Sequence, residues 1–199
     1  MKEQRTLVII KHDAVMRGLM GEVIQRLERV GLKLIALEFI AATEDMGDKH
    51  YASSEENLTR FGGNTLGEYK KKGIDPKGKF GTDDPLELGR MIKRWNVELM
   101  TKGPVLATVW QGPDAVAIVR KLAGATAPKE AVPGSIRGDF SWDNFEVAND
   151  ELRSVYNIVH VSGNEKEAEF EINLWFTKDE LFPDYELYAH RAMHKMKSE

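Results

Sequence analysis

The stretch from Thr6 to Ala41, TLVIIKHDAVMRGLMGEVIQRLERVGLKLIALEFIA, decides the fold. Its first six residues form a short β-branched run that is typical of a buried strand. Residues 32–41 read as a second strand. Between them, apolar side chains recur at three- and four-residue spacing and stop at Gly31, which predicts an amphipathic helix ended by glycine. The apolar positions are Met16, Leu19, Met20, Val23, Leu27 and Val30.

The rest of the chain continues the alternation of strands and helices. We predict helices over 44–60, 86–101, 113–123 and 163–175, and strands over 104–110 and 156–161. Pro113 is expected in the first turn of its helix. Residues 61–85 and 124–154 are rich in glycine, proline and charge without a period, which predicts a long loop or partly ordered insertion and an irregular segment. The tail from residue 178 is polar and expected to be helical in part.

This element order predicts the fold class. A β-α-β-(α)-β-α-β-α order favours a two-layer α/β sandwich of the split βαβ kind over an all-α or all-β fold. The length of 199 residues predicts a single domain with insertions.

Composition excludes several classes of function. The chain has no cysteine, which excludes disulfides, thiolate catalysis and zinc–thiolate sites and fits a reducing compartment. The net charge of −4 gives no overall basic field for nucleic acid. The apolar run near the N-terminus spans four residues, too few for a signal-peptide core or a membrane span. We therefore expect a cytoplasmic protein.

Common catalytic and metal motifs are missing from the sequence. It contains no phosphate-loop motif and no dinucleotide-binding fingerprint. It also contains no serine-hydrolase nucleophile elbow and no H-E-x-x-H zinc motif. His190 and His194 form an i,i+4 pair, but no third ligand lies near them in sequence. We expect no metal held by protein ligands.

Several cations and one hydroxyl come from loops and element ends. Lys11 closes the first strand, Arg17 precedes the first helix, Arg120 lies near the end of the 113–123 helix, and Thr126 and Arg137 follow in glycine-containing segments. Arginine forks and lysine charges of this kind suit a polyphosphate. Scattered surface cations are the alternative, because sequence spacing does not show whether these residues converge.

The stretch NIVHVSGNE, residues 157–165, places His160 at the end of a strand. A histidine attacks phosphorus when one ring nitrogen is unprotonated and the other is held by an acceptor. Ser162 and Glu165 fit a capping box at the start of the next helix. That helix offers four carboxylates, Glu165, Glu167, Glu169 and Glu171. A core histidine bonded to the backbone is the alternative, and periodicity alone favours it.

Six segments together resemble the nucleoside diphosphate kinase family. They are RTLVIIKHDAVMRGLMGEVIQRLERVGLKLIALE (5–38), GPVLATVWQG (103–112), GATAP (124–128), PGSIRGDF (133–140), NIVHVS (157–162) and EAEFEINLWF (167–176). The resemblance implies a ferredoxin-like βαββαβ antiparallel sheet with helices packed on it and added helices. It also implies ping-pong transfer of a γ-phosphate from ATP or another nucleoside triphosphate to a nucleoside diphosphate. Mg²⁺ would be held by the nucleotide phosphates, and a homo-oligomer, with a hexamer as the family default, would be the assembled form.

The resemblance assigns roles to individual residues. His160 looks like the phospho-accepting histidine, Glu171 like the carboxylate that orients it, and Ser162 like the serine beside it, with Lys11 as a further catalytic residue. The implied nucleotide-binding set is Lys11, Tyr51, Arg90, Arg120, Thr126, Arg137 and Asn157. Arg90 is placed by counting back from Gly103 through a divergent stretch.

The chain also departs from the family pattern. His12 stands where the family has proline, Val161 where it has a small residue, and Ala127 where it has asparagine. Insertions are expected around 60–90 and 141–156. The first falls where the family stacks the nucleobase, which leaves three candidates for the stacking residue: Phe61, Tyr69 and Trp95. No cluster of Asn or Asp stands out as a reader of the base edge, so broad nucleobase acceptance is expected.

Two other functions stay open at this point. One is a catalytically inactive family member that serves as a nucleotide-binding or interaction module. The full set of six site residues argues against such decay: Lys11, Arg120, Arg137, Asn157, His160 and Glu171. The other is nucleic-acid binding through Lys70, Lys71 and Lys72, for which a solvated loop is the alternative.

Overall fold

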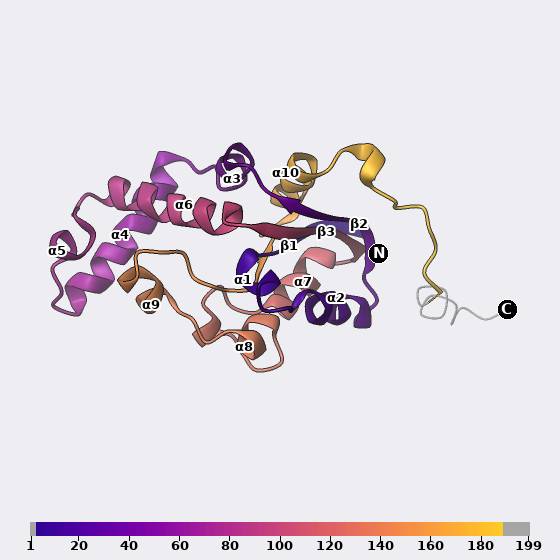
Figure 1. The fold of residues 1–199 in the computed structure, drawn as a ribbon, viewed down its shortest axis with the longest axis horizontal. Helices are drawn as coiled ribbons and strands as arrows, with labels where there is room; N and C mark the ends of the chain where they lie inside the picture. The colour runs from indigo at the N-terminus through magenta and orange to yellow at the C-terminus, as the bar shows by residue number, and fades with distance from the viewer. Residues whose placement is uncertain (1–2, 189–199) are drawn as a thin grey trace.

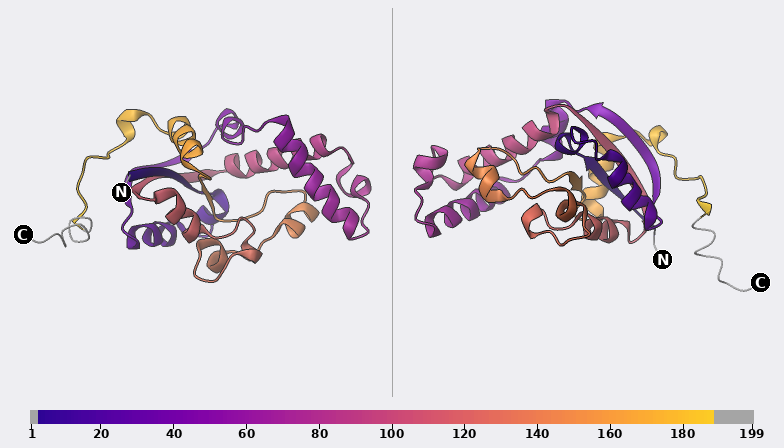
Figure 2. Two further views of the ribbon diagram at one scale, coloured as in Figure 1. Left: turned by 180° about the vertical axis from the view of Figure 1, so that it is seen from behind. Right: turned by 60° about the horizontal axis from the view of Figure 1, so that its bottom comes forward.

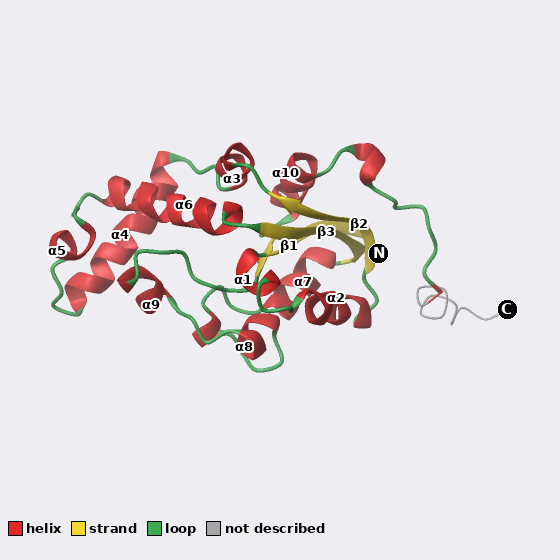
Figure 3. Cartoon of the chain, viewed as in Figure 1, coloured by secondary structure: helices red, strands yellow, loops and turns green. Residues whose placement is uncertain are grey.

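The computed structural model describes residues 3–188, and its centre is a four-stranded antiparallel sheet (Figures 1 and 3). The strands are β1 (Glu3–Ile10), β2 (Lys33–Ala41), β3 (Pro104–Pro113) and β4 (Val159–Val161). They lie in the order β2-β3-β1-β4, and each neighbouring pair is antiparallel. Strand β1 is thus central and next to the short strand β4.

Two helices complete the βαββαβ core, and further helices are added to it. The α-helices are α1 (His12–Val15), α2 (Met20–Arg29), α3 (Glu44–His50), α4 (Glu55–Lys71), α5 (Pro76–Phe80), α6 (Pro85–Thr101), α7 (Ala115–Ala123), α8 (Ile136–Phe140), α9 (Phe145–Asp150) and α10 (Glu165–Trp175). Two 3-10 turns cover Pro128–Glu130 and Lys178–Glu180. The order β1-α2-β2-β3-α7-β4 confirms the predicted ferredoxin-like sandwich with added helices.

Helices cover both faces of the sheet, which explains why β1 is apolar at successive positions. Val8 and Ile10 pack with residues of α2 and α7, among them Val23 and Val119. Leu7 and Ile9 point to the other face, where they pack with Ile172 and other apolar residues of α10. Burying each such side chain stabilises the fold by about 1.5–3 kcal/mol.

The prediction of a loop over residues 61–85 is wrong, because most of this segment is helical. Helix α4 runs through it to Lys71, and α5 follows before α6 returns toward the sheet. The glycines of this segment misled the prediction, since one of them, Gly62, serves a close helix crossing together with Gly89 of α6. A Cβ on Gly62 would lie 2.0 Å from the carbonyl oxygen of Pro85, and one on Gly89 would lie 2.1 Å from that of Leu58. The backbones of α4 and α6 therefore approach where a side chain would separate them.

Helices α4, α5 and α6 form an arm that projects from one end of the sheet (Figures 1 and 2). The arm has a small core of its own, made of Leu66, Tyr69, Phe80, Leu88 and Trp95. Helix α9 packs against it through polar contacts. The Tyr69 hydroxyl donates to Asp150 Oδ1 at 2.9 Å, and Lys72 pairs with Glu146 at 3.0 Å. The two segments expected to be insertions thus contact each other.

Other predicted boundaries need smaller corrections. Residues 51–54 separate α3 from α4 inside the expected 44–60 helix. Pro113 ends β3 instead of opening α7, and the final strand starts at Val159 instead of residue 156. The irregular 124–154 segment contains the short helices α8 and α9.

Two sequence features outside the core have simple structural outcomes. Lys70, Lys71 and Lys72 lie at the C-terminal end of α4, where basic groups complement the helix dipole. His190 and His194 lie outside the described residues. Within residues 3–188, no helix is both long and apolar enough to cross a membrane.

We expect Gly62→Ala to destabilise the arm, because the added methyl group would meet the backbone of Pro85. Overpacking of this kind costs about 1–3 kcal/mol in the free energy of unfolding. The matched control is Gly67→Ala on the same helix, where a Cβ meets nothing within 4 Å. It should stabilise the helix by about 0.5–1 kcal/mol. Denaturant unfolding of both variants measures the difference, and equal stabilities would contradict the close crossing.

Candidate active site

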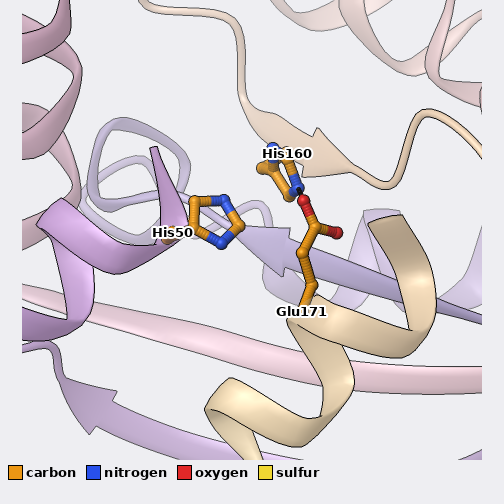
Figure 4. A group of neighbouring side chains, drawn as sticks. All are labelled: His50, His160 and Glu171. Atoms are coloured by element: carbon orange, nitrogen blue, oxygen red, sulfur yellow. Dashed lines mark hydrogen bonds and ion pairs between the residues drawn. The ribbon is translucent and has the colours of Figure 1, made fainter. Parts of the chain in front are cut away.

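His160 is the middle residue of strand β4 and pairs with Ile9 of β1. Its ring nitrogen Nε2 lies 2.8 Å from Oε1 of Glu171, which comes from helix α10 (Figure 4). The other ring nitrogen, Nδ1, lies on the side of the ring away from Glu171 (Figure 4). Within the described residues, no hydrogen bond to Nδ1 is made.

Glu171 is 5% exposed and links the imidazole to the backbone of β1. Its Oε2 accepts a hydrogen bond from Ser162 Oγ at 2.6 Å, and Ser162 Oγ accepts one from the Leu7 amide at 3.1 Å. An ionised carboxylate only accepts, so the His160 proton belongs on Nε2 and Nδ1 keeps its lone pair. Burial raises the pKa of Glu171, and the hydrogen bond from Ser162 opposes that rise.

The predicted capping box of Ser162 and Glu165 is wrong. Helix α10 is capped by Asn164, whose side chain accepts from the Glu167 amide. Ser162 is fully buried, and its hydroxyl serves Glu171 instead. The serine therefore fixes the carboxylate that holds His160.

The environment of His160 keeps the imidazole neutral. Burial lowers the pKa of His160 to about 3, and the nearby charges of Lys11 and Arg137 add to the effect. A neutral ring with a fixed Nε2 proton is the nucleophilic form of histidine.

His50, at the end of α3, packs edge-to-face on His160 with 4.2 Å between ring centroids. Its Nδ1 accepts from Trp175 Nε1 at 3.2 Å, and burial lowers the pKa of His50 to about 3. Ligand atoms of His50, His160 and Glu171 lie within 4.8 Å of one another, which is close enough for the three side chains to share a metal ion. His160 and Glu171 are bonded to each other, however, which favours the hydrogen-bonded arrangement. No sequence signal pointed to His50.

A cavity of about 330 Å³ brings together seven of the predicted catalytic and nucleotide-binding residues. Its lining includes Lys11, Tyr51, Arg120, Thr126, Arg137, Asn157 and His160. Sequence spacing did not show whether the cationic side chains converge, and in the fold they line the same cavity. Burial raises the pKa of Tyr51, whose hydroxyl therefore stays protonated.

Lys11 is 5% exposed and is held in the cavity by Asn157. Its Nζ donates to Asn157 Oδ1 at 2.8 Å, and Asn157 Nδ2 donates to the carbonyl of Thr126 at 3.0 Å. Burial lowers the pKa of Lys11 to about 8. Asn157 thus ties the lysine to the loop that carries Thr126.

Arg137 and Arg120 have different environments. Arg137 lies on α8 and is buried, and its guanidinium donates to the carbonyls of Gly124 at 2.7 Å and Val159 at 2.9 Å. Burial lowers the pKa of Arg137 to about 10. Arg120 is exposed at the cavity, and its side chain bonds to no other residue in the described part of the chain. Arg137 therefore holds together the segments that form the cavity walls, while the guanidinium of Arg120 is available to a ligand.

A strained turn precedes His160. Ile158 has φ of 69°, a region that is unusual for a β-branched residue and costs about 1–3 kcal/mol. The Val159 amide donates to the Asn157 carbonyl at 2.7 Å, which closes a three-residue turn. Asp13 Oδ2 accepts from the Ile158 amide at 3.0 Å and helps to hold it. The turn lets both Asn157 and His160 reach the cavity.

Some predicted residues lie elsewhere. Arg90 is on α6 outside the cavity lining, with its exposed guanidinium 2.7 Å from Glu55. Arg17 also lies outside this lining and donates to the carbonyl of Phe140. Of the three stacking candidates, Trp95 lines the cavity, whereas Phe61 and Tyr69 do not.

Other cavity residues were missed from the sequence. Arg153 is one, and its guanidinium is paired with Asp143 at 2.6 Å. The others include Ile92 and Asn96 from α6 and Phe145 and Asn149 from α9. They sit in segments that no motif marked, so the sequence carried no signal for them.

The departures from the family pattern are accommodated locally. His12 begins α1, and its ring covers Gly103, where a Cβ would lie 2.2 Å from His12 Cε1. Val161 continues strand β4 opposite Val8, a setting that suits a β-branched residue. Ala127 is buried before Pro128.

Comparisons with known proteins all point to one family. The model of the nucleoside diphosphate kinase family matches residues 4–63 and 90–181. The nucleoside diphosphate kinase of Pyrobaculum aerophilum is 49% identical over 181 residues, covering 91% of this chain and 99% of that protein.

Solved structures show the same likeness. The crystal structure of an NDP kinase from Pyrobaculum aerophilum has a TM-score of 0.87 at 48% identity and covers 91% of this chain and 100% of that one. The Borrelia burgdorferi enzyme, solved as a transition state mimic with vanadate and ADP, has a TM-score of 0.77 at 33% identity, with 96% of each chain covered. The chain therefore belongs to the nucleoside diphosphate kinase family of phosphotransferases.

Proposed function

We propose that this chain carries the γ-phosphoryl group of a nucleoside triphosphate on His160 Nδ1 and delivers it to a nucleoside diphosphate. The supporting observation is the chain of hydrogen bonds from Leu7 through Ser162 and Glu171 to a neutral His160 that lines a cation-rich cavity. This arrangement supplies a fixed nucleophile beside groups that suit phosphate oxygens.

In the first half-reaction, Nδ1 forms a bond to the γ-phosphorus while the bond from that phosphorus to the β–γ bridging oxygen breaks. The electron pair leaves with the nucleoside diphosphate. The ring then carries positive charge, which Glu171 stabilises through Nε2–H. The second half-reaction runs the same step in reverse with another diphosphate as acceptor.

The cationic side chains neutralise the charge that spreads over the phosphoryl oxygens. Phosphoryl transfer depends mainly on in-line positioning and on such charge stabilisation. Lys11 and Arg120 face the ligand, and Arg137 keeps the walls in place. Thr126 adds an exposed hydroxyl at the same edge.

The family reaction needs a divalent cation, and we propose Mg²⁺ bound to the nucleotide phosphates. Among the described residues that line the cavity, none is an aspartate or glutamate. This lining fits a cation that arrives with the substrate instead of one held by protein ligands. When bound, Mg²⁺ would neutralise part of the phosphate charge.

Further parts of the proposal concern substrates and assembly. The ADP seen in the Borrelia burgdorferi enzyme supports ATP and other nucleoside di- and triphosphates as ligands. We also propose one domain with insertions around 60–90 and 141–156, and a cytoplasmic homo-oligomer, with a hexamer as the family default. Exposed apolar side chains on edge strand β2, Leu37 and Phe39, support contact with another copy.

The inactive-module alternative gains no support from the site. Lys11, Arg137, Asn157 and His160 all line one cavity, and Glu171 stands behind the histidine. Nothing in this geometry suggests that a catalytic group has been lost.

Incubation with ATP and Mg²⁺ should add one acid-labile phosphoryl group to the protein, detected by intact mass. His160→Ala should lack the adduct because the attacking nitrogen is gone. His12→Ala, which removes a histidine outside the cavity lining, should still form it. A native protein that remains unmodified under these conditions would contradict the phosphohistidine mechanism.

Glu171→Gln should slow phosphorylation of the enzyme while nucleotide affinity stays nearly unchanged. A hydrogen bond to a charged group contributes about 1.5–3 kcal/mol, which corresponds to a rate loss of roughly 10–150-fold. Rapid-quench phosphorylation and equilibrium nucleotide binding separate the two effects. Glu169→Gln on the exposed side of the same helix is the control and should behave like the native protein. Lower affinity with an unchanged rate would show that Glu171 has a structural role.

A further inference from the structure

The hydrogen bond from His160 to Glu171 fixes one nitrogen of the imidazole but only weakly fixes the plane of the ring. The bond is made at Nε2, 2.8 Å from the carboxylate oxygen. Nε2 of a histidine lies close to the axis of the Cβ–Cγ bond, so rotation about that bond moves Nδ1 farther than it moves Nε2. The preferred angles of this torsion are also broad. The direction of Nδ1, which attacks phosphorus in the proposed transfer, therefore depends on what packs against the ring.

The ring of His50 packs against His160. His50 is the last residue of α3, and the two rings meet edge-to-face with 4.2 Å between centroids and 78° between planes. In Figure 4, the side of the His50 ring that carries its nitrogens is turned toward His160 and Glu171. Edge-to-face packing joins the positive edge of one ring to the negative face of the other. Such a contact resists rotation of the His160 ring.

Trp175 in turn holds His50. Its indole N–H donates to His50 Nδ1 at 3.2 Å, and the two rings lie edge-to-face with 5.8 Å between centroids. An indole nitrogen donates and does not accept, so Nδ1 of His50 carries no proton. Burial lowers the pKa of His50 to about 3 and keeps the ring neutral, which places its proton on Nε2. Since Nδ1 is bonded and Nε2 is protonated, His50 has no lone pair left for a metal ion.

The contact between His50 and His160 is one of packing. His50 is 8% exposed, and within residues 3–188 its Nε2 is buried without a hydrogen-bond partner. A buried N–H without a partner costs about 1–3 kcal/mol. Phenylalanine would avoid this cost but would leave the Trp175 N–H without its acceptor. Histidine at this position therefore supplies a ring that packs on His160 and is itself held by a hydrogen bond.

Helix α10 thus reaches His160 by two routes. Glu171 and Trp175 are both buried and lie four residues apart, which places them on the same face of the helix. Glu171 bonds to His160 directly, and Trp175 acts through His50. The first route fixes Nε2, and the second fixes the plane of the ring.

We propose that His50 is a positioning residue for phosphoryl transfer, because its ring sets the plane of the His160 imidazole and thereby the direction of Nδ1. For its effect on rate, the inference rests on the proposed function. His50 is not among the residues that line the active-site cavity, so it acts through His160 and not on the nucleotide. A misplacement of about 1 Å at a reacting centre slows a reaction by roughly 100-fold.

His50→Ala should lower the rate of His160 phosphorylation by ATP and Mg²⁺ by roughly 10–100-fold, measured by rapid quench. Equilibrium nucleotide binding should stay within about threefold of the native value, because the cavity lining is unchanged. Lys49→Ala is the matched control, since this neighbouring side chain of α3 is 58% exposed. It should phosphorylate like the native protein. A native rate in His50→Ala, or a loss of affinity without a loss of rate, would overturn the proposal.

Two further variants separate packing from hydrogen bonding. His50→Phe keeps a ring edge at the His160 face and should phosphorylate within about threefold of the native rate. His50→Gln keeps an N–H without a ring and should be as slow as His50→Ala. Both side chains fill the site, so their comparison decides the question even where His50→Ala fails to fold. Rescue by glutamine and not by phenylalanine would contradict a role in packing.

A measurement on the free protein separates this inference from the proposed function. NMR relaxation of the His160 Cε1–H bond reports the order of the ring without nucleotide or phosphoryl transfer. The order parameter should be high in the native protein and in His50→Phe, and lower in His50→Ala. This result would support the positioning of the ring even if no phosphohistidine formed. Equal order parameters in the native protein and in His50→Ala would overturn it.

Discussion

The site depends on one carboxylate, Glu171, which bonds to His160 with one oxygen and to Ser162 with the other. Ser162 is in turn bonded to the amide of Leu7, 155 residues earlier in the chain. The direction of the imidazole is therefore set by the central strand of the sheet. Because the carboxylate accepts from both sides, the His160 proton is confined to Nε2, and Nδ1 is left to react. A hydrogen-bonded chain of this kind aligns a nucleophile before substrate arrives.

The segments added to the βαββαβ core complete the cavity at its other end. The arm of α4, α5 and α6 lies beside α9, and Tyr69 and Asp150 join them. Their meeting places Asn96 and Asn149 at the cavity wall. The core thus supplies Lys11, Arg120 and His160, while the added helices supply further residues of the cavity lining.

Local periodicity was enough to predict the sheet. The apolar side chains of β1 have the spacing of a buried strand, and those of α2 have the spacing of a helix with one covered face. Helix α6 of the arm was predicted, but α5 and the part of α4 beyond residue 60 were missed, because Gly62 allows two helices to cross closely and yet looks like a loop residue in sequence. The hydrogen bond between Lys11 and Asn157 could not be predicted from the spacing of residues in the sequence, since 146 residues separate them. Ser162 has the sequence context of a helix cap, and its bond to Glu171 becomes visible only after folding.

The central claim is that His160 is a neutral imidazole with its proton on Nε2. Burial lowers its pKa to about 3, so the ring should stay unprotonated as the pH falls from 8 to 5. Nitrogen NMR of histidine-labelled protein measures both the charge and the tautomer. The account predicts a protonated Nε2 and an unprotonated Nδ1 throughout that range. A His160 signal that titrates near its usual pKa of about 6.5, or a proton on Nδ1, would contradict it.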